Sequence, residues 1–151
     1  MTISVDLNKK NSISLAQSLL AIISFLFLFL NCVKYYDQGV SGFTAWLGAN
    51  GGKASFGGGL FLFFIILLLI IPLCKVFLEK QVASFRSLLN YIIIGIAANS
   101  IILLLFGGTR LMVNVNKTVI KNIHLAFGAV LEIFLMVCIG GASAVDEFVL
   151  K

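Results

Sequence analysis

Glu132 is the residue whose type and position most suggest chemistry, because it interrupts the apolar stretch AVLEIFLMV. A charged side chain at the centre of a membrane span costs about 2.5–3.5 kcal/mol on insertion scales, so such a group usually faces other helices and often marks a proton or ion path. Asn99 and Ser24 lie near the middle of two other apolar stretches. We therefore predict an intramembrane polar node of Glu132, Asn99 and Ser24, in which Asn99 is the partner of Glu132.

His124 and Gly128 precede Glu132 at intervals of four residues, which would place the three on one face of a helix. Gly128 would allow another backbone to approach one turn from the carboxyl group. The arrangement has two interpretations. In the first, a polar path leads from His124 at the membrane surface to the buried acid. In the second, Glu132 and Asn99 only join helices by hydrogen bonding, and His124 lies among lipid headgroups.

Metal, redox and hydrolytic chemistry have little support in the sequence. The three cysteines and the one histidine show neither CxxC nor HExxH spacing, and GxSxG is absent. Cys32, Cys74 and Cys138 lie in or at the ends of apolar segments, where a buried cysteine serves as a small apolar residue. We expect no metal, no cofactor and no enzymatic activity.

The composition requires a lipid environment for most of the chain. Of the 151 residues, 60% are hydrophobic and 11% are charged, and the mean hydropathy is +1.10. Soluble domains are roughly 25% charged, so this chain has too little polar surface to cover a core in water. The positive charges behind the net charge of +5 occur in ones and twos, which argues against a nucleic-acid partner and favours membrane lipids with anionic headgroups.

Four apolar segments have the length of about 20 residues that a helix needs to cross the hydrocarbon core. They cover residues 13–33, 56–77, 88–106 and 123–144. The residues before Cys32 are too large for a cleavage site, so we expect the first segment to be retained rather than removed as a signal peptide. The predicted fold is all-α, with residues 1–151 forming a single bundle of four transmembrane helices.

The basic residues indicate the orientation of this bundle, because Lys and Arg favour the cytoplasmic side of a membrane. With both termini on one side, that side carries six basic residues, namely Lys9, Lys10, Lys75, Lys80, Arg86 and Lys151. The opposite side carries five, namely Lys34, Lys53, Arg110, Lys117 and Lys121. We therefore predict that both termini lie in the cytoplasm and that the protein lies in the plasma membrane.

Aromatic residues mark the first of the two outer loops, KYYDQGVSGFTAWLGANGGKAS. Aromatic side chains favour the headgroup boundary, and the segment 40–47 could form a short amphipathic turn on the membrane surface. The residues from which we expect outer-loop contacts are Tyr35, Tyr36, Phe43 and Trp46.

The second outer loop places Leu111, Val113 and Val115 in alternation with Met112, Asn114 and Asn116, a pattern similar to that of a half-exposed strand. This pattern predicts a small extracytoplasmic β element in which the loop pairs with the first outer loop. The same loop contains the N-glycosylation sequence Asn116-Lys117-Thr118, which has meaning only on the lumenal face of a eukaryotic membrane.

Four features follow one another along the chain: a Lys9-Lys10 pair before the first helix, the outer stretch VSGFTAWLG, the helix start FGGG and a short basic inner loop. With these features the chain resembles the small four-helix (tetraspan) membrane proteins of low-GC Gram-positive bacteria. Eukaryotic tetraspan junction proteins are similar in layout, but their W-x-x-C-x-C outer-loop signature is missing here. Ring subunits of rotary ATPases are similar in size and in having an acid in the fourth helix, but their helices are richer in Gly.

Two functions from different classes fit these observations. The first is a non-enzymatic accessory, immunity or assembly subunit whose bulky apolar helices pack against a larger integral membrane protein or against further copies of this chain. The alternative is a transport component in which Glu132 binds a proton or another cation at mid-membrane. The sequence favours the first function, because the spans contain a single polar node and no discontinuous helix pair of the kind that transporters use.

Overall fold

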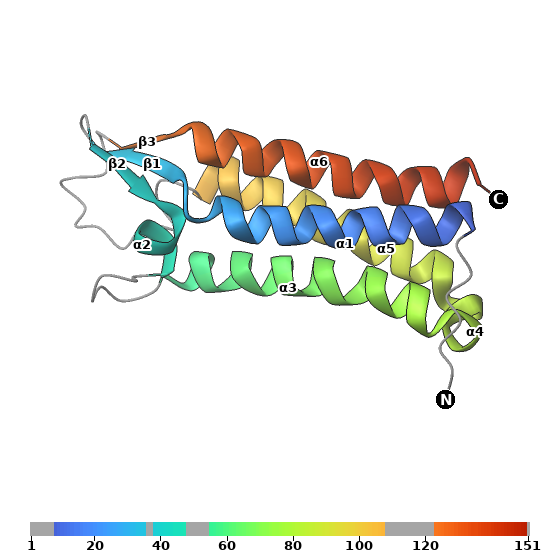
Figure 1. Ribbon diagram of the computed structural model, residues 1–151. Coiled ribbons are helices and arrows are strands. Elements are labelled where there is room, and N and C mark those ends of the chain that lie inside the picture. Colours follow the sequence, from blue (N-terminus) through green and yellow to red (C-terminus); the bar gives the residue numbers. More distant parts are fainter. Residues whose placement is uncertain (1–7, 36–37, 48–54, 108–122, 151) are drawn as a thin grey trace.

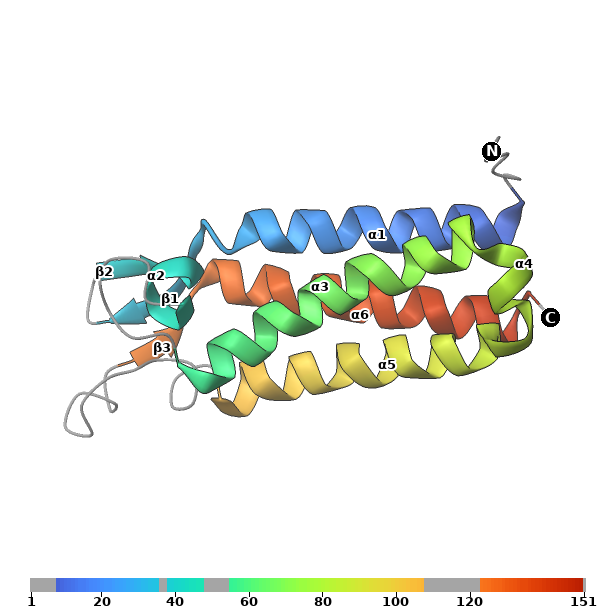
Figure 2. The same ribbon diagram turned by 90° about the horizontal axis from the view of Figure 1, so that it is seen from below.

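The computed structural model describes residues 8–35, 38–47, 55–107 and 123–150. Four long helices form an antiparallel bundle in which each helix mainly contacts two neighbours, in the circular order α1, α3, α5, α6 (Figure 1). These helices are α1 (Lys9–Phe27), α3 (Phe56–Phe77), α5 (Arg86–Ile102) and α6 (Phe127–Phe148). Seen from below, α3 crosses obliquely between α1 and α5 (Figure 2). The predicted all-α class with four transmembrane helices is confirmed.

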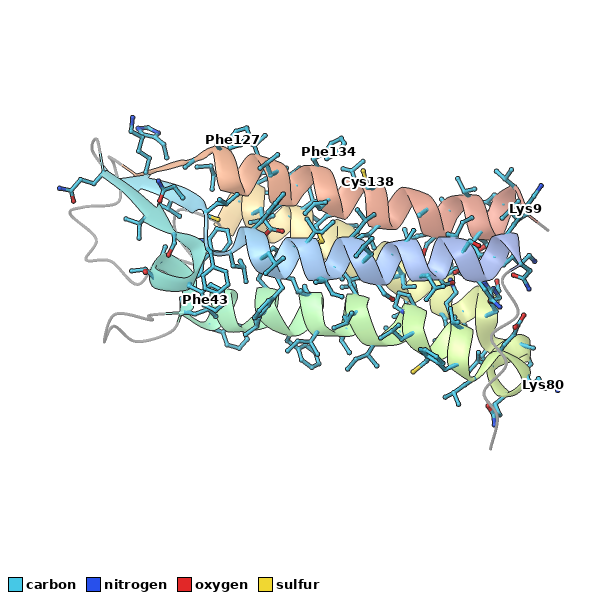
Figure 3. The ribbon with its side chains drawn as sticks, viewed as in Figure 1. Lys9, Phe43, Lys80, Phe127, Phe134 and Cys138 are labelled. Carbon is cyan, nitrogen blue, oxygen red and sulfur yellow. The ribbon has the colours of Figure 1, made fainter. Side chains whose placement is uncertain are left out.

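The outer surface of the bundle is apolar. All four helices are long and apolar enough to cross a membrane, and their large exposed side chains include Phe56, Phe63 and Phe134. Figure 3 shows Phe127 and Phe134 pointing away from the other helices. Such a surface is stable in lipid and not in water, so these helices identify an integral membrane protein.

Capping residues set the starts of the helices. The Ser55 hydroxyl accepts a hydrogen bond from the Gly58 backbone N–H at 3.0 Å, and α3 covers the residues that the sequence predicts. α1 begins four residues before its predicted start because Asn8 caps it, accepting from the Asn11 backbone N–H at 2.9 Å. α6 begins four residues late, since residues 123–125 form a strand instead of its first turn.

The connection between α3 and α5 is helical. It consists of α4 (Glu79–Val82) and one turn of 3-10 helix (Ala83–Phe85). This connection lies at the end of the bundle where α1 begins and α6 ends, which we call the termini end (Figure 1). At the opposite end, α5 continues into a π-helical turn (Leu103–Gly107).

A three-stranded antiparallel sheet covers the opposite end of the bundle, which we call the sheet end (Figure 1). The strands are β1 (Asn31–Tyr35), β2 (Gln38–Ser41) and β3 (Ile123–Leu125), in the order β2-β1-β3. β1 takes residues that the sequence assigned to the first helix, so α1 ends six residues before its predicted end. The predicted small β element is confirmed, although the expected strand at positions 111–116 lies outside the described residues.

The short helix α2 (Gly42–Leu47) joins the sheet to the bundle. Its Trp46 side chain is buried and packs edge-on against Phe61 of α3, with ring centroids 5.5 Å apart. Gly58 in the first turn of α3 lies against the same segment, and a Cβ atom there would be 2.1 Å from the Trp46 carbonyl oxygen. The absence of a side chain at Gly58 therefore allows α2 to rest directly on α3.

Replacing Gly58 with alanine should destabilise the protein, because the added methyl group requires α2 and the start of α3 to move apart. Overpacking of this kind costs about 1–3 kcal/mol. Gly59→Ala is the matched control, since a methyl group there meets nothing within 4 Å and alanine favours a helix by up to about 1 kcal/mol. Thermal unfolding in detergent should show a lower Tm for Gly58→Ala only, and equal Tm values would contradict this packing.

Candidate functional site

The carboxyl group of Glu132 is fully buried between α6 and α1. The Ser24 hydroxyl of α1 donates a hydrogen bond to its oxygen Oε2 at 2.5 Å. The other oxygen, Oε1, is buried and has no hydrogen-bond partner among the described residues. Because burial without a cationic partner disfavours the charged form of a carboxyl group, this environment suits the neutral, protonated acid.

Glu132 lies closer to the sheet than the sequence suggested. α6 begins at Phe127 rather than at residue 123, so Glu132 falls in the second turn of the helix and not at its centre. Five residues of helix place it about 8 Å from the start of α6. Ser24 is in the last turn of α1, whose C-terminal end meets the start of α6. The pair therefore lies just beneath the sheet.

Asn99 is not the partner of Glu132, and this part of the predicted polar node is wrong. Its side chain is exposed on the outer surface of α5 and donates back to the Gly95 carbonyl oxygen at 2.8 Å. The inward positions of α5 include Ala97 and Ser100, and one residue along a helix rotates the side chain by about 100°. α5 does lie beside α6, as expected, but it turns Asn99 away from it.

His124 lies in β3 rather than in α6, so the predicted row of His124, Gly128 and Glu132 on one helix face is wrong. The His124 side chain is exposed, and its backbone pairs with Lys34 of β1. Gly128 does allow a close backbone approach, since a Cβ atom there would be 2.8 Å from the Asn31 carbonyl oxygen. The start of β1 therefore closes the bundle near Glu132.

Cys32 belongs to this closure. Its thiol is buried and donates to the Phe27 carbonyl oxygen at 3.6 Å. Burial raises the pKa of the Cys32 thiol to about 12, while a backbone hydrogen bond with Gly42 opposes this shift. The thiol therefore stays protonated at physiological pH and is unreactive, because the thiolate is the nucleophile. This behaviour agrees with the small apolar role that the sequence suggests.

Two aromatic side chains of the first outer loop, Phe43 and Trp46, are described, and both pack against other aromatic rings of the protein. Trp46 is 1% exposed, so the expected outer-loop contact through its side chain is wrong. Phe43 is half-buried and stacks on Phe29, with ring centroids 4.4 Å apart. Tyr35 is a residue of β1 whose side chain lies outside the described part of the chain, as does the whole of Tyr36. The amphipathic turn predicted for residues 40–47 corresponds to α2.

The inward face of α1 is polar, a feature not anticipated from the sequence. Large apolar side chains such as Leu19, Ile22 and Leu26 are exposed on its outer face. Its buried residues are Asn11, Ser14, Gln17, Ser18, Ala21 and Ser24. The signal is present in the sequence, because polar or small residues recur there every three or four positions. α1 thus has the reverse of the arrangement found in helices of water-soluble proteins.

Polar contacts from the middle of this face reach α6 and α3. The Gln17 amide nitrogen donates to the Ile139 carbonyl oxygen at 3.0 Å and to the Ser143 hydroxyl at 2.7 Å, both in α6. The Ser18 hydroxyl donates to the Leu69 carbonyl oxygen of α3 at 3.3 Å. The Gln17 oxygen Oε1 is buried and has no partner within the described ranges. Gln17 and Glu132 therefore each present an unpaired acceptor to the interior.

A buried ionic cluster lies at the termini end of the bundle. The Lys75 ammonium group of α3 is 2.9 Å from Asp146 Oδ2 of α6, and both side chains have no exposed surface. Lys75 also donates to the Asn90 side-chain oxygen of α5 at 2.5 Å. The Arg86 guanidinium group of α5 is 3.2 Å from the same Asp146 oxygen. We refer to Lys75, Arg86, Asn90, Asp146 and Glu147 as the ionic cluster.

The ionic cluster joins all four spans. Arg86 donates to the side chains of Asn11 and Ser14 in α1, each at 3.4 Å. Glu147 accepts from the Ser87 hydroxyl at 2.8 Å and from the Asn90 amide at 3.2 Å. The sequence was interpreted differently, with Lys75 and Arg86 as loop charges that report orientation. They belong instead to α3 and α5 and point into the bundle.

No protein-family model, curated protein or solved structure matches the chain. Within the described ranges, no three His, Cys, Asp or Glu side chains are grouped so that they could hold a metal ion.

The candidate site consists of two polar regions and the helix face that connects them. The Glu132–Ser24 pair lies beneath the sheet, the ionic cluster lies at the termini end, and the inward face of α1 runs between them.

Breaking the Lys75–Asp146 ion pair should cost more stability than removing both charges together. Asp146→Asn leaves the Lys75 ammonium group buried without its carboxylate, a loss that typically destabilises a protein by about 3–5 kcal/mol. The double variant Lys75→Met, Asp146→Asn removes the fully buried pair and should recover part of that loss, although the partly exposed Arg86 still lacks its carboxylate. Unfolding in mixed micelles measures the difference, with Lys80→Met as an exposed control. A double variant less stable than Asp146→Asn alone would contradict the pairing.

Proposed function

We propose that this protein is a non-enzymatic accessory subunit that binds a transmembrane helix of a larger membrane protein through the outer face of α5. This face consists of Gly95, Ala98 and Asn99 with the exposed apolar side chains of Ile92 and Ile102 on either side. The observation that carries the proposal is the outward position of Asn99, an amide side chain within a membrane span that does not face its own bundle.

Among the described residues, Asn99 has one hydrogen-bond partner on this surface. Its side chain donates one hydrogen bond to the Gly95 carbonyl oxygen of the same helix. Lipid tails offer no partner for the remaining N–H and the amide oxygen, and leaving such groups unpaired in an apolar medium is unfavourable. A second helix that carries a hydroxyl, amide or free carbonyl group at this depth would satisfy them. We therefore expect the partner helix to present such a group to Asn99.

Small residues beside Asn99 suit a close approach of a partner helix. A Cβ atom on Gly95 would meet nothing within 4 Å among the described residues outside the helix's own backbone, and Ala98 is exposed. Small residues at helix contacts in membranes let two backbones approach, and a polar side chain then hydrogen-bonds across the contact. Because Asn99 makes no contact with the bundle interior, its replacement should affect binding and leave the fold unchanged.

Asn99→Leu should weaken the association with the partner without lowering Tm. Interhelical hydrogen bonds in membranes contribute about 1 kcal/mol, so the affinity should fall about fivefold. The measurement is native mass spectrometry of the complex extracted from native membranes in mild detergent, with Val137→Leu on the exposed face of α6 as the control. Equal recovery of the complex from the two variants would contradict the proposal, as would a complex containing only copies of this chain.

The buried carboxyl group of Glu132 favours a second candidate function, proton- or cation-coupled transport. Its support is the pairing of Glu132 with a neutral hydroxyl group rather than with a basic side chain. A group in such surroundings changes charge when it binds or releases a proton, as acids in transport pathways do. A carboxyl group that only joined helices would not need to change its charge.

Glu132→Gln tests this second candidate. The glutamine side chain keeps an oxygen that accepts from Ser24, so helix contacts are retained, but it cannot release a proton in the relevant pH range. In vesicles that contain the purified full-length protein, a proton flux driven by a pH gradient should be lost in Glu132→Gln and retained in Asn99→Leu. A flux that is unchanged in Glu132→Gln would restrict Glu132 to a structural role.

A further inference from the structure

We infer that the partner helix bound at Asn99 also contacts α6 at Gly141, so that it lies along the line where α5 and α6 meet and not between α5 and α3. The inference rests on the proposed function, because it adds a second helix to the surface that includes Asn99. A helix seated on Ala98 would have Asn99 on one side and Gly141 on the other.

Gly141 and Asn99 lie at nearly the same depth in the bundle. A Cβ atom on Gly140 of α6 would be 3.3 Å from the Ala97 Cβ atom of α5, so these two positions are level. Gly141 follows Gly140 by one residue, and Asn99 follows Ala97 by two. Because α5 and α6 are antiparallel, the two positions are about 4.5 Å apart along the bundle. A single helix can therefore contact both.

Ala98 lies on the side of α5 that faces α6. The Ser87 hydroxyl on this side donates to Glu147 of α6 at 2.8 Å. The Tyr91 and Phe148 rings meet edge-on, with centroids 6.2 Å apart. Ala98 follows Ser87 and Tyr91 by about three and two helical turns, so it lies on the same side. Its small, exposed side chain would let another helix approach α5 and α6 together.

Gly141 lies on the corresponding side of α6. It precedes Phe148, which contacts Tyr91 of α5, by about two turns. Phe134 lies about two turns further towards the sheet, is 63% exposed and points away from the other helices (Figure 3). Val145, one turn from Gly141 in the other direction, is 42% exposed. The outer face of α6 therefore presents large apolar side chains on both sides of a position that has none.

The packing of the described chain does not require a glycine at position 141. A Cβ atom on Gly141 would meet nothing within 4 Å among the described residues outside the helix's own backbone, whereas one on the adjacent Gly140 would contact Ala97. Glycine also weakens a helix relative to alanine. A close approach by a helix outside the chain would give a reason for the missing side chain.

A transmembrane helix suits this surface better than a lipid chain does. A lipid chain can cover Gly141, but it has no group that hydrogen-bonds to Asn99. We expect the partner helix to place a large apolar side chain over Gly141 and a hydroxyl, amide or free carbonyl group beside Asn99. The opposite flank of α5 is less suitable, because Ile96, two residues before Ala98, places a branched side chain there.

Gly141→Leu tests the contact by filling the position. Native mass spectrometry of the complex from native membranes should show about tenfold weaker association, because a large side chain at a closely packed position displaces the partner helix. Tm should not fall, since a Cβ atom there meets nothing in the described chain. Gly59→Leu on α3 is the matched control, because a Cβ atom at this exposed glycine also meets nothing within 4 Å. Val137→Leu, one turn from Gly141, exchanges one branched side chain for another and should also leave the association unchanged.

Photo-cross-linking gives a second measurement of the same contact. Benzoylphenylalanine is introduced in place of Phe134 of α6 or Phe63 of α3. Both side chains are exposed, and each lies seven residues after the start of its helix at the sheet end. Illumination of native membranes should join position 134, and not position 63, to a protein with the mass of the partner in the native complex.

An association of Gly141→Leu equal to that of the unsubstituted protein would overturn the inference, as would a cross-link from position 63 instead of position 134. If Gly141→Leu lowers Tm, the smaller change Gly141→Ala should still weaken the association at an unchanged Tm. A complex that contains only copies of this chain would overturn the inference together with the proposed function.

The two variants separate this inference from the proposed function. If Asn99→Leu weakens the complex and Gly141→Leu does not, partner binding through α5 stands and the contact with α6 is wrong. If Gly141→Leu weakens the complex and Asn99→Leu does not, a partner contacts α6 and the proposed role of Asn99 is wrong. If neither variant weakens it, both are wrong.

Discussion

Hydrogen bonding in the absence of water is the constraint on which this structure depends. A polar group within a membrane span has no solvent partner, so it must be paired inside its own bundle or against another protein. α1 meets this constraint by turning polar and small residues inward and large apolar residues outward. Contacts from α1 to its neighbours therefore combine van der Waals packing with hydrogen bonds at fixed positions along the helix. Because hydrogen bonds are directional, these bonds fix the rotation of each helix about its axis.

These polar contacts differ in kind at the two ends of the bundle. At the termini end, Lys75 and Arg86 share the Asp146 carboxylate, and each of the four spans contributes a side chain. Near the sheet, Glu132 has one neutral donor and one unpaired oxygen. Compensated charges hold a structure in one arrangement, because separating them exposes a buried charge. Glu132 has no cationic partner among the described residues, so its charge is not compensated in the way that the charges of the ionic cluster are.

The features that depend on length and composition could be predicted from the sequence. The side-chain contacts could not, because they depend on how each helix is rotated about its axis. Hydropathy located four spans and all of α3, but it could not recognise that Asn8 starts α1 early or that a strand replaces the first turn of α6. The partner of Glu132 was expected from chain order, which favours α5. The inward pattern of α1 identifies Ser24 instead. Lys75 lies inside the predicted span 56–77 but was counted with the charges of the inner loop, because hydropathy cannot show that a buried counterion on another helix holds it in the bundle interior.

The two asparagines of α5 show how one helix can serve two separate tasks. Asn90 and Asn99 are nine residues apart, and at about 100° per residue they lie on opposite faces. Asn90 contacts Lys75 and Glu147 inside the bundle, whereas Asn99 is exposed on the outside. Asn99 has no polar partner in the interior of the bundle among the described residues, so packing inside the chain gives no reason for an amide at that position. An amide whose hydrogen bond among the described residues is to its own helix, in a medium that cannot hydrogen-bond to it, is the feature on which we base the proposed contact with a partner helix.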